Sequence, residues 1–491
     1  MGLTDQEIVR REKLQKLIDK GVDPFGQKFT VQHHSVEAKK LAEGKTHDDL
    51  EALSLQTSVA GRIVLLRNMG KASFITIQDK LGTIQAYIRK DVIGDDAYSI
   101  FELADLGDIV GIEGTLMLTK TGEITVKAKT YTHLVKALRP LPEKYHGLSD
   151  VEERYRRRYV DLIVNEEARK VALMRPKIIR LIQQQMDEQG YVEFETSMLQ
   201  STLGGASARP FVTHHNALDR DFYLRIATEL PLKRLLVGGL ERVYEIGRLF
   251  RNEGIDTRHN PEFTTIEAYQ AYGDLSDMQN LAQNLLSTLA LKLTGSYEVP
   301  WGDKTISLKP PFRSVHMVDL IKEHTGIDFF KPMTFEEAKA LADQHNIHLE
   351  KHENAVGYVI NKFFETFCEK KLVQPTFVTG HPLEISPLAK KSKDSRFTER
   401  FELFIDGSEY ANAFTELNNP LDQEERFQAQ LAAKARGDKE ASENDVDFLE
   451  ALQFGMPPAG GIGIGIDRLV MLLTNQSSIR EVILFPTLKT K

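Results

Sequence analysis

The sequence contains little of what marks several classes of protein. A single cysteine, Cys368, among 491 residues excludes an intrachain disulfide and a zinc site with several cysteine ligands. No apolar run reaches the roughly 18 residues that a membrane-spanning helix needs. The charged start, MGLTDQEIVRREKLQKL, lacks the apolar segment of a secretory signal. We therefore expect a cytoplasmic protein without a membrane partner.

Basic residues are not in excess either. The chain has 63 Lys and Arg against 71 Asp and Glu, a net charge of −8, which disfavours a nucleic-acid binder that relies on bulk positive charge. It has no GxxxxGK[ST] motif, which excludes a P-loop ATP site. The glycine run 461–465 is followed by Ile466, where the dinucleotide fingerprint GxGxxG needs glycine.

The first part of the chain has the pattern of a small barrel. Residues 3–20 predict an amphipathic helix, and period-two alternation begins near Ser58. Three strands, a helix near 96–103 and two more strands follow, an order that predicts a five-stranded OB-fold. Pro140 and Pro142 then end the pattern. The predicted strands are 58–65, 73–78, 83–88, 108–118 and 123–133.

The rest of the chain predicts a mixed α+β module. We expect an N-terminal helical extension over 1–55, the barrel over 56–145 and a second domain over 146–491, with a helix-rich insertion at about 318–375. The arginines at 154–158 fit either a solvated helix face or a phosphate contact. The expected strands are 191–195, 223–226, 241–251, 262–272, 400–405 and 408–417, and the expected helices are 166–189, 276–293, 423–435 and 445–452.

One predicted strand carries polar and charged side chains on a face where a packed core would have apolar ones. Alternation puts Phe263, Thr265, Glu267 and Tyr269 on one strand face. An aromatic ring, a carboxylate and a phenol make a poor core. They make a good floor for a site that stacks a base and holds a cation.

A predicted hairpin carries two more carboxylates. Asp406-Gly407 is a strong two-residue turn signal, and in that register Glu402 faces Ala411 and Phe404 faces Glu409. Glu402 and Glu409 then share a face, an arrangement that suits Mg²⁺.

Three further residues of the hairpin alternate along its second strand. Strict alternation places Asn412, Phe414 and Glu416 on the face opposite Glu409. We predict a one-residue bulge near Tyr410–Ala411 that brings both groups to the same face.

These segments together resemble a known family. FRNE (250–253) with RHNPEFT (258–264) resembles motif 2 of class II aminoacyl-tRNA synthetases, and GIGIGIDR (461–468) resembles motif 3. GYVEFETSML (190–199) is similar to motif 1, although Ser197 replaces its usual proline. GGASARP (204–210) resembles the lysyl branch in particular. The resemblance implies a catalytic domain built on an antiparallel sheet with flanking helices, and a homodimer formed through motif 1.

The resemblance also implies roles for individual residues. The family joins an amino acid to ATP and then to tRNA, here L-lysine and tRNA(Lys), with Mg²⁺ as cofactor. Arg251 and Arg468 would be catalytic and hold phosphates, and Glu402 and Glu409 would bind the metal. The remaining ATP contacts implied are Glu253 at the adenine edge, His259 at the far phosphates and Phe263 under the adenine ring.

The choice of amino acid rests on charge as well as on resemblance. An aspartate pocket needs a cation, whereas Glu229, Glu267 and Glu416 with Tyr269 suit ammonium groups. Gly205, Asn412 and Phe414 would shape the slot. Two alternatives stay open: an aspartyl- or asparaginyl-tRNA synthetase relative, and a non-catalytic OB-fold nucleic-acid binder.

The barrel offers its own candidates. Alternation places Phe74 on the polar face, with Gln85, Tyr87 and Arg62 on neighbouring strands. Exposed aromatic rings on an OB sheet stack unpaired bases. By resemblance, Arg62, Phe74, Gln85 and Glu113 would meet the tRNA anticodon.

Overall fold

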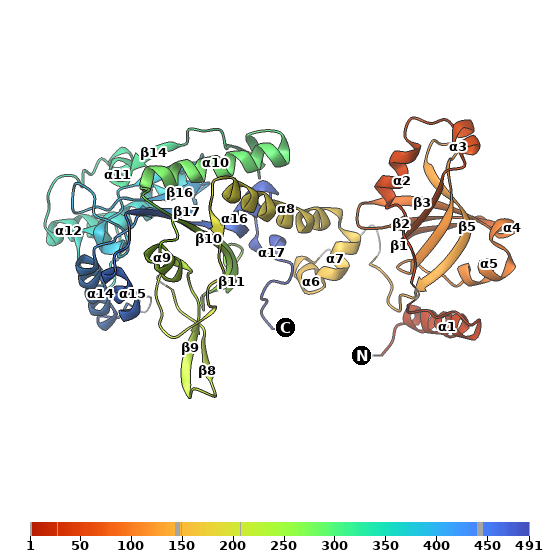
Figure 1. Cartoon of the computed structure of the whole chain (residues 1–491), viewed down its shortest axis with the longest axis horizontal. Helices are drawn as coiled ribbons and strands as arrows, with labels where there is room; N and C mark the ends of the chain where they lie inside the picture. The colour runs from red at the N-terminus through yellow and green to blue at the C-terminus, as the bar shows by residue number, and fades with distance from the viewer. Residues whose placement is uncertain are drawn as a thin grey trace. The chain divides into compact units, whose positions relative to one another are not determined.

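The computed structural model describes residues 2–26, 28–142, 148, 150–206, 208–438 and 445–490. It divides the chain into two compact units, Met1–Ser149 and Asp150–Lys491 (Figure 1). The boundary predicted near residue 145 lies outside the described residues. Each unit has its own core and is described separately.

The first unit is a closed barrel, as the sequence predicts. Its strands follow the order β1-β2-β3-β5-β4, and inward-facing side chains such as Ile75, Ile77 and Ala86 are buried in one core. Short helices α4 (Lys90–Ile93) and α5 (Asp95–Phe101) separate the third and fourth strands. The strand bounds are β1 Gln56–Asn68, β2 Ala72–Gln78, β3 Thr83–Arg89, β4 Ile109–Leu118 and β5 Ile124–Val135.

The residues before the barrel complete it. The predicted first helix is α1 (Asp5–Asp19), whose Arg10 donates to the carbonyls of Leu106 and Ala137 at 2.9 and 2.8 Å. The sequence did not reveal α2 (Ser35–Ala42) and α3 (His47–Leu53), because both are short and mostly polar. Ala38, Ala42 and Leu50 nevertheless belong to the barrel core. Helices α2 and α3 thus share that core.

The second unit is built on one eight-stranded sheet. Its order is β14-β15-β16-β17-β18-β11-β10-β6, and its neighbours pair antiparallel except β14 with β15 and β10 with β6. This confirms the α+β class and the mainly antiparallel sheet. The strand bounds are β6 Val192–Glu193, β10 Arg242–Phe250, β11 Glu262–Ala271, β14 Arg313–His316, β15 Thr376–Thr379, β16 Arg400–Ile405, β17 Ser408–Thr415 and β18 Ala459–Gly465.

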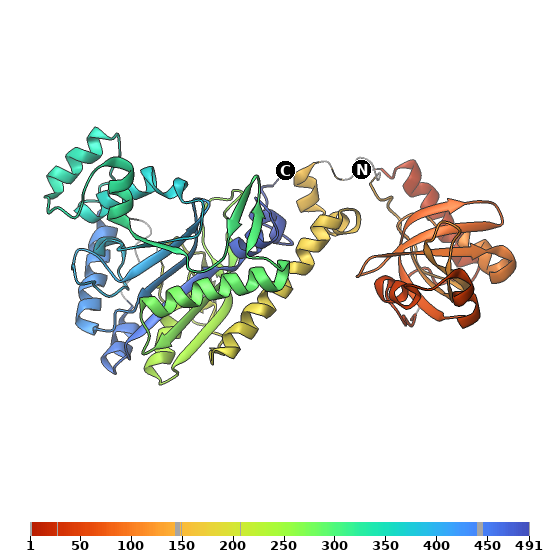
Figure 2. The ribbon, with the colours of Figure 1, turned by 90° about the horizontal axis from the view of Figure 1, so that it is seen from above.

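Helices cover both faces of this sheet. α8 (Glu166–Glu188), α10 (Leu275–Thr294) and α16 (Ile466–Leu473) pack apolar side chains into one large core, and Figure 2 shows α8 and α10 running along the sheet. On the other face, α9 (Glu229–Val237), α14 (Pro420–Ala435) and α15 (Val446–Gln453) form a second core with β10 and β11. That face also carries the cavity described below.

One expected strand of the second unit lies elsewhere, and the helix-rich segment at about 318–375 has the expected content. The strand expected at 223–226 is β9 (Arg220–Leu224), which lies outside the main sheet in a small sheet with β7 (Leu199–Gln200) and β8 (Val212–His215). The insertion consists of α11 (Met317–Thr325), α12 (Phe335–Gln344) and α13 (Val356–Phe367). It joins the parallel strands β14 and β15, which need a crossover connection.

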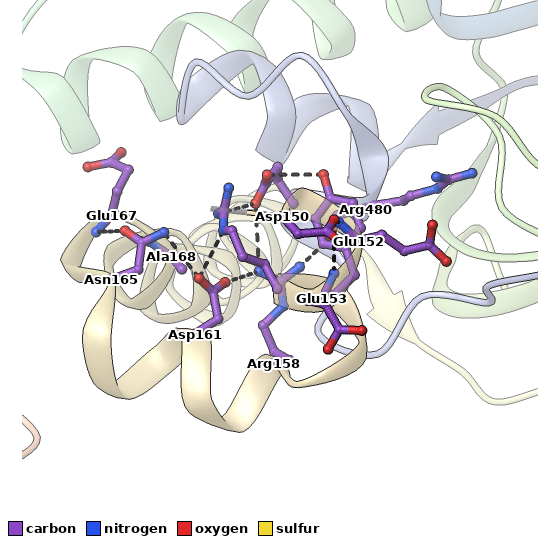
Figure 3. A network of polar contacts seen from close by, with 12 residues as sticks. Asp150, Glu152, Glu153, Arg158, Asp161, Asn165, Glu167, Ala168 and Arg480 are labelled. Carbon is purple, nitrogen blue, oxygen red and sulfur yellow. Dashed lines mark hydrogen bonds and ion pairs between the residues drawn. The ribbon is translucent and has the colours of Figure 1, made fainter. Parts of the chain in front are cut away.

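The arginines at 154–158 include structural ones. Arg158 is 1% exposed and pairs with Asp161 at 2.8 Å, as Figure 3 shows. Arg154 bonds Asp161 at 3.0 Å and Glu481 at 3.1 Å. These bonds tie α6 (Val151–Arg156) and α7 (Arg158–Val164) to the short helix α17 (Ile479–Val482). Arg154 and Arg158 are therefore neither a solvated face nor free for phosphate.

No helix within the described residues combines the length and the apolar character needed to cross a bilayer.

Candidate active site

A cavity of about 690 Å³ opens on the second unit's sheet. Its walls come from β11, β16, β17 and β18, the loop after β10 and the start of α16. Most of the predicted site residues line it: Gly205, Glu229, Arg251, Glu253, His259, Phe263, Glu267, Tyr269, Glu402, Glu409, Asn412, Phe414 and Arg468. Glu416 is 1% exposed and is not among the lining residues.

The hairpin β16–β17 contains the predicted bulge. Asp406 and Gly407 both have positive φ, at 49° and 62°, as the predicted turn requires. Phe404 pairs with Glu409 as expected, but the register then shifts by one residue at Tyr410. The expected pairing of Glu402 with Ala411 is therefore wrong, because the bulge sets Glu402 opposite Asn412.

This shift aligns functional side chains in rows across the sheet. Glu402, Asn412, Gly463 and Glu267 form one continuous row through β16, β17, β18 and β11. Three inter-strand steps separate its two carboxylates, roughly 14 Å. The carboxylate predicted to bind a metal and the carboxylate predicted to bind the amino acid thus lie in one cavity.

The next row explains the alternating glycines. Phe414, Gly461 and Tyr269 are paired across β17, β18 and β11. A Cβ on Gly461 would collide with the Tyr269 ring and the Glu416 carboxylate. Glycine on the middle strand therefore leaves a slot between the two aromatic residues.

The predicted amino-acid end of the cavity concentrates buried acids. Glu267 is 8% exposed and accepts hydrogen bonds from Thr228 N and the Tyr269 hydroxyl, both at 3.1 Å. Burial, and then the neighbouring Glu229 carboxylate, raise the pKa of Glu267 to about 7. A cation in this slot would favour the ionised form of Glu267.

A buried lysine that the sequence reasoning missed lies among these acids. Lys233 is fully buried, and its Nζ lies 2.5 Å from Glu229 Oε1 and contacts Glu416. The same ammonium lies 5.1 Å from the centre of the Phe414 ring. Burial raises the pKa of Glu416, and contact with Lys233 opposes that rise. The i, i+4 spacing of Glu229 and Lys233 on α9 was the available signal.

The other end of the cavity carries the predicted metal carboxylates. Burial raises the pKa of Glu402 to about 7; Arg400 opposes this shift, while Glu409 and Glu369 add to it. Arg400 donates to Glu402 at 2.6 Å, and Arg468 lies 3.9 Å from a Glu409 oxygen. The described residues contain no group of three or more potential ligands that could hold a metal alone. Two carboxylates do fit Mg²⁺ that arrives with a nucleotide's phosphates.

The two predicted catalytic arginines come from different elements. Arg251 follows β10, and its guanidinium lies 5.1 Å from the centre of the Phe263 ring. Its Nε is buried without a hydrogen-bond partner among the described residues. Arg468 lies in the first turn of α16. Its neighbour Asp467 accepts from Thr264 N at 2.7 Å and from Arg175 of α8, which fixes the start of that helix.

The loop between β10 and β11 holds the remaining nucleotide candidates. Glu253 and His259 are exposed and line the cavity. His259 Nδ1 lies 2.8 Å from Asp256, a partner that was not predicted. Hydrogen bonds from His259 and Arg258 outweigh the effect of burial and hold the pKa of Asp256 below its usual value. Asp256 therefore orients His259.

The barrel brings only some of its candidates together. Phe74 and Tyr87 stack at 4.6 Å between ring centres. Gln85 lies two residues from Tyr87 along β3, on the same face, and accepts from Thr125 at 2.9 Å. Arg62 donates to the Gly107 carbonyl at 2.7 Å. Glu113 is exposed on β4, where it accepts from Thr130. It pairs five residues along β5 from Thr125, roughly 16 Å away.

Sheet, motif residues and barrel together define a class II aminoacyl-tRNA synthetase. Residues 150–489 match the family model of class II tRNA synthetases (D, K and N), and residues 57–134 match that of the OB-fold nucleic acid binding domain. The chain is 56% identical to the lysine–tRNA ligase of Bacillus cytotoxicus over 100% of this chain and 98% of the relative. It is 57% identical to that of Lactococcus lactis subsp. cremoris, over 99% of each. The chain therefore belongs to the lysine–tRNA ligase family.

Proposed function

We propose that the cavity activates L-lysine with ATP and that the chain transfers the lysyl group to the 3′ end of tRNA(Lys). The charge balance of the amino-acid end carries this proposal. Glu229, Glu267 and Glu416 lie close enough to interact, and the one internal ammonium beside them, that of Lys233, contacts Glu229 and Glu416. Two carboxylates in excess match the α- and ε-ammonium groups of lysine.

The same balance argues against the aspartyl and asparaginyl alternatives. An aspartate side chain would add a carboxylate to a slot that already has an excess of them, at a cost of several kcal/mol. An asparagine side chain would leave a buried acid without a cation. ATP–pyrophosphate exchange measured with each of the twenty amino acids tests this choice. Exchange with aspartate and none with lysine would overturn it.

The chemistry of activation needs charge stabilisation more than proton transfer. The lysine carboxylate is ionised at neutral pH and attacks the α-phosphorus of ATP without a general base. An acyl–phosphate bond forms, the bond to pyrophosphate breaks, and lysyl-adenylate results. We assign Arg251 to the α-phosphate oxygens in the transition state and Arg468 to the γ-phosphate.

The remaining nucleotide contacts follow from the same assignment. Phe263 would stack under adenine once the guanidinium that now covers its ring binds phosphate. Glu253 and His259 would contact the adenine edge and the far phosphates.

Glu402 and Glu409 are the residues that would hold Mg²⁺. The ion supplies positive charge to the phosphates when it is bound. In the second reaction a ribose hydroxyl of the tRNA attacks the lysyl carbonyl, and AMP leaves. Loss of Mg²⁺-dependent exchange in Glu402→Gln, with lysine binding retained, would support this assignment.

The barrel would bind the anticodon. Phe74 and Tyr87 provide stacked rings on the outer face, and Gln85 offers an amide at the same face. Arg62 and Glu113 remain further candidates for anticodon contacts. Wild-type protein that bound tRNA without exchange activity would instead favour the non-catalytic alternative.

We also propose a cytoplasmic homodimer formed through the motif 1 elements. Four apolar side chains on α8, β6 and the segment that leads into β7 are about half exposed, an exposure that a partner subunit would reduce. They are Leu173, Val192, Met198 and Leu199, at 57%, 54%, 49% and 47%. Sedimentation of Leu173→Asp beside the wild type tests this, with a shift to monomer expected.

A further inference from the structure

Arg400 has no role in the reaction described so far, although it lines the cavity together with Glu402 of the proposed metal subsite and Asn412 of the proposed amino-acid subsite. It is on β16, two residues before Glu402 and on the same strand face. Its side chain is 14% exposed. A charged group this buried requires partners, and the identity of those partners shows what it does.

Every nitrogen of the Arg400 guanidinium donates a hydrogen bond. Nη1 donates to the Ile385 carbonyl at 2.8 Å and to Ser386 Oγ at 2.9 Å. Nη2 donates to Glu402 Oε1 at 2.6 Å, and Nε donates to Asn412 Oδ1 at 3.0 Å. The first two bonds anchor the guanidinium to the segment before β16. The last two bonds reach Glu402, which is proposed to bind the metal, and Asn412, which is proposed to bind the amino acid.

The bond to Asn412 fixes the chemical character of that amide. Arginine has donors only, so the amide atom that faces it must be the oxygen. The Nδ2 end is then the part of Asn412 that remains for a ligand, and it can only donate. Its fitting partner is an anionic oxygen, such as the carboxylate of the amino acid.

The bond to Glu402 joins the metal end to the same guanidinium. One oxygen of Glu402 is held by Arg400, which leaves the other for a cation. A shift of Glu402 toward a metal would therefore act on Arg400, and through it on Asn412. The bulge at Tyr410 makes this possible, because it sets Asn412 directly opposite Glu402.

We propose that Arg400 is a positioning residue that orients the Asn412 amide as a donor to the amino-acid carboxylate and couples amino-acid binding to binding of the metal–nucleotide. This inference rests on the proposed function of the two subsites. It concerns two ligands whose affinities depend on one shared group, and such a dependence is reciprocal.

Calorimetric titration of the full chain tests the coupling. Lysine is titrated with and without saturating Mg²⁺ and a non-hydrolysable ATP analogue, and the ratio of the two dissociation constants is measured. We expect a wild-type ratio of roughly fivefold or more, in the usual range of such couplings. In Arg400→Lys, whose single ammonium cannot bridge both partners, we expect the ratio to fall towards one. Asn412→Leu should lower it in the same way, which keeps the test available if Arg400→Lys does not fold.

Two controls separate positioning from a general structural role. Arg396→Lys changes a surface arginine paired with Asp394 and should keep the wild-type ratio. Cadaverine has the two ammonium groups of lysine but no carboxylate, so Arg400→Lys should weaken lysine and leave cadaverine unchanged. Equal loss for both ligands, or an unchanged ratio in Arg400→Lys, would overturn the inference. If the chain binds another amino acid in place of lysine, the proposed function fails, and the ratio measured with that amino acid still decides the role of Arg400.

Discussion

Each unit of this chain buries one lysine between two carboxylates, and the two clusters differ in how their partners are satisfied. In the barrel unit, Lys136 bonds Asp105 and Asp108, and Asp108 also accepts from the backbone nitrogens of Asp105 and Ala137. In the second unit, Lys233 pairs with Glu229 and Glu416. For the Glu416 carboxylate, Lys233 is the one polar partner found among the described residues.

The surroundings of the two lysines differ as well. Lys136 also donates to the Leu103 carbonyl, and Lys13 pairs with Asp105 at 2.6 Å, so both acids of this cluster have donors besides Lys136. Beside Lys233 lies a third acid, Glu267, which forms no ion pair within the described residues and accepts only from Thr228 N and the Tyr269 hydroxyl. A buried ionic cluster with all partners present supports the fold, whereas one with charge in excess is built to receive a ligand.

The largest expected effect is on stability, and it tests whether both clusters support the fold equally. We expect Lys233→Met and Lys136→Met each to lower the free energy of unfolding by about 3–5 kcal/mol, because each leaves a buried carboxylate uncompensated. Denaturant unfolding of the full chain, followed by probes in each unit, measures both.

A double variant in the same experiment tests whether the two clusters differ in ligand binding. Lys233→Met with Glu416→Gln removes both charges and should recover most of the lost stability. Saturating lysine should stabilise the wild type and not the double variant, because the double variant has lost a ligand carboxylate. Equal stabilisation of both would contradict the distinction between the clusters.

Two arginines of the second unit differ in the same way, one with all its partners present and one without. Arg225 is 1% exposed and bonds Glu245, Thr196 and the Arg248 carbonyl, whereas Arg251 has a buried Nε without a partner in the described chain. We expect Arg251→Lys to lower lysine-dependent exchange by about 10²–10³-fold, the usual loss of a transition-state donor, with little change in stability. Arg225→Lys should instead lower the stability of the chain and leave lysine-dependent exchange almost unchanged. Parallel losses of activity and stability in both would count against this reading.

In the barrel, the half-buried aromatic pair Phe74 and Tyr87 is the proposed ligand contact that corresponds to the cavity of the second unit. Phe74→Ala should raise the KM for tRNA by the equivalent of about 1–3 kcal/mol, the usual value of one stacked base. Lysine-dependent exchange, which needs no tRNA, should be unchanged. A matched loss of exchange would show that the substitution acts through the fold.

Local sequence patterns were enough to predict many of the strands and turns of this molecule. Alternation of side chains predicted the five barrel strands and the face that carries Phe74. The Asp406-Gly407 turn and the positions of Asn412 and Phe414 were enough to predict a bulge. These features depend on neighbours along the chain or across one hairpin, so a single sequence contains their cause.

Contacts between residues far apart in the sequence could not be predicted from local sequence patterns. Nothing near Lys233 in the sequence names Glu416 as a partner, and nothing near Arg154 indicates Glu481, which lies 327 residues away. Such pairs form only after the sheet has brought distant strands and helices together. Local patterns therefore predicted charged residues that line the cavity, but they missed the internal counter-ions Lys233 and Arg400.

The smallest expected effect is a pH dependence. As the pH rises, the affinity for lysine should increase and the stability of the ligand-free chain should decrease. Burial and the Glu229 carboxylate raise the pKa of Glu267 to about 7 in the ligand-free chain, above its unfolded value. Lysine's ammonium groups favour ionised Glu267, so lysine affinity should rise between pH 6 and 8, by at most about tenfold per unit below the pKa. The contribution of Glu267 to ligand-free stability has the opposite sign: it is present at low pH and is lost as the pH rises through 7. Calorimetric titration and thermal unfolding across that range measure both slopes, and Glu267→Gln, which cannot ionise, should flatten both. A wild-type affinity that fell as the pH rose would mean that the excess negative charge of this cluster does not serve to bind lysine.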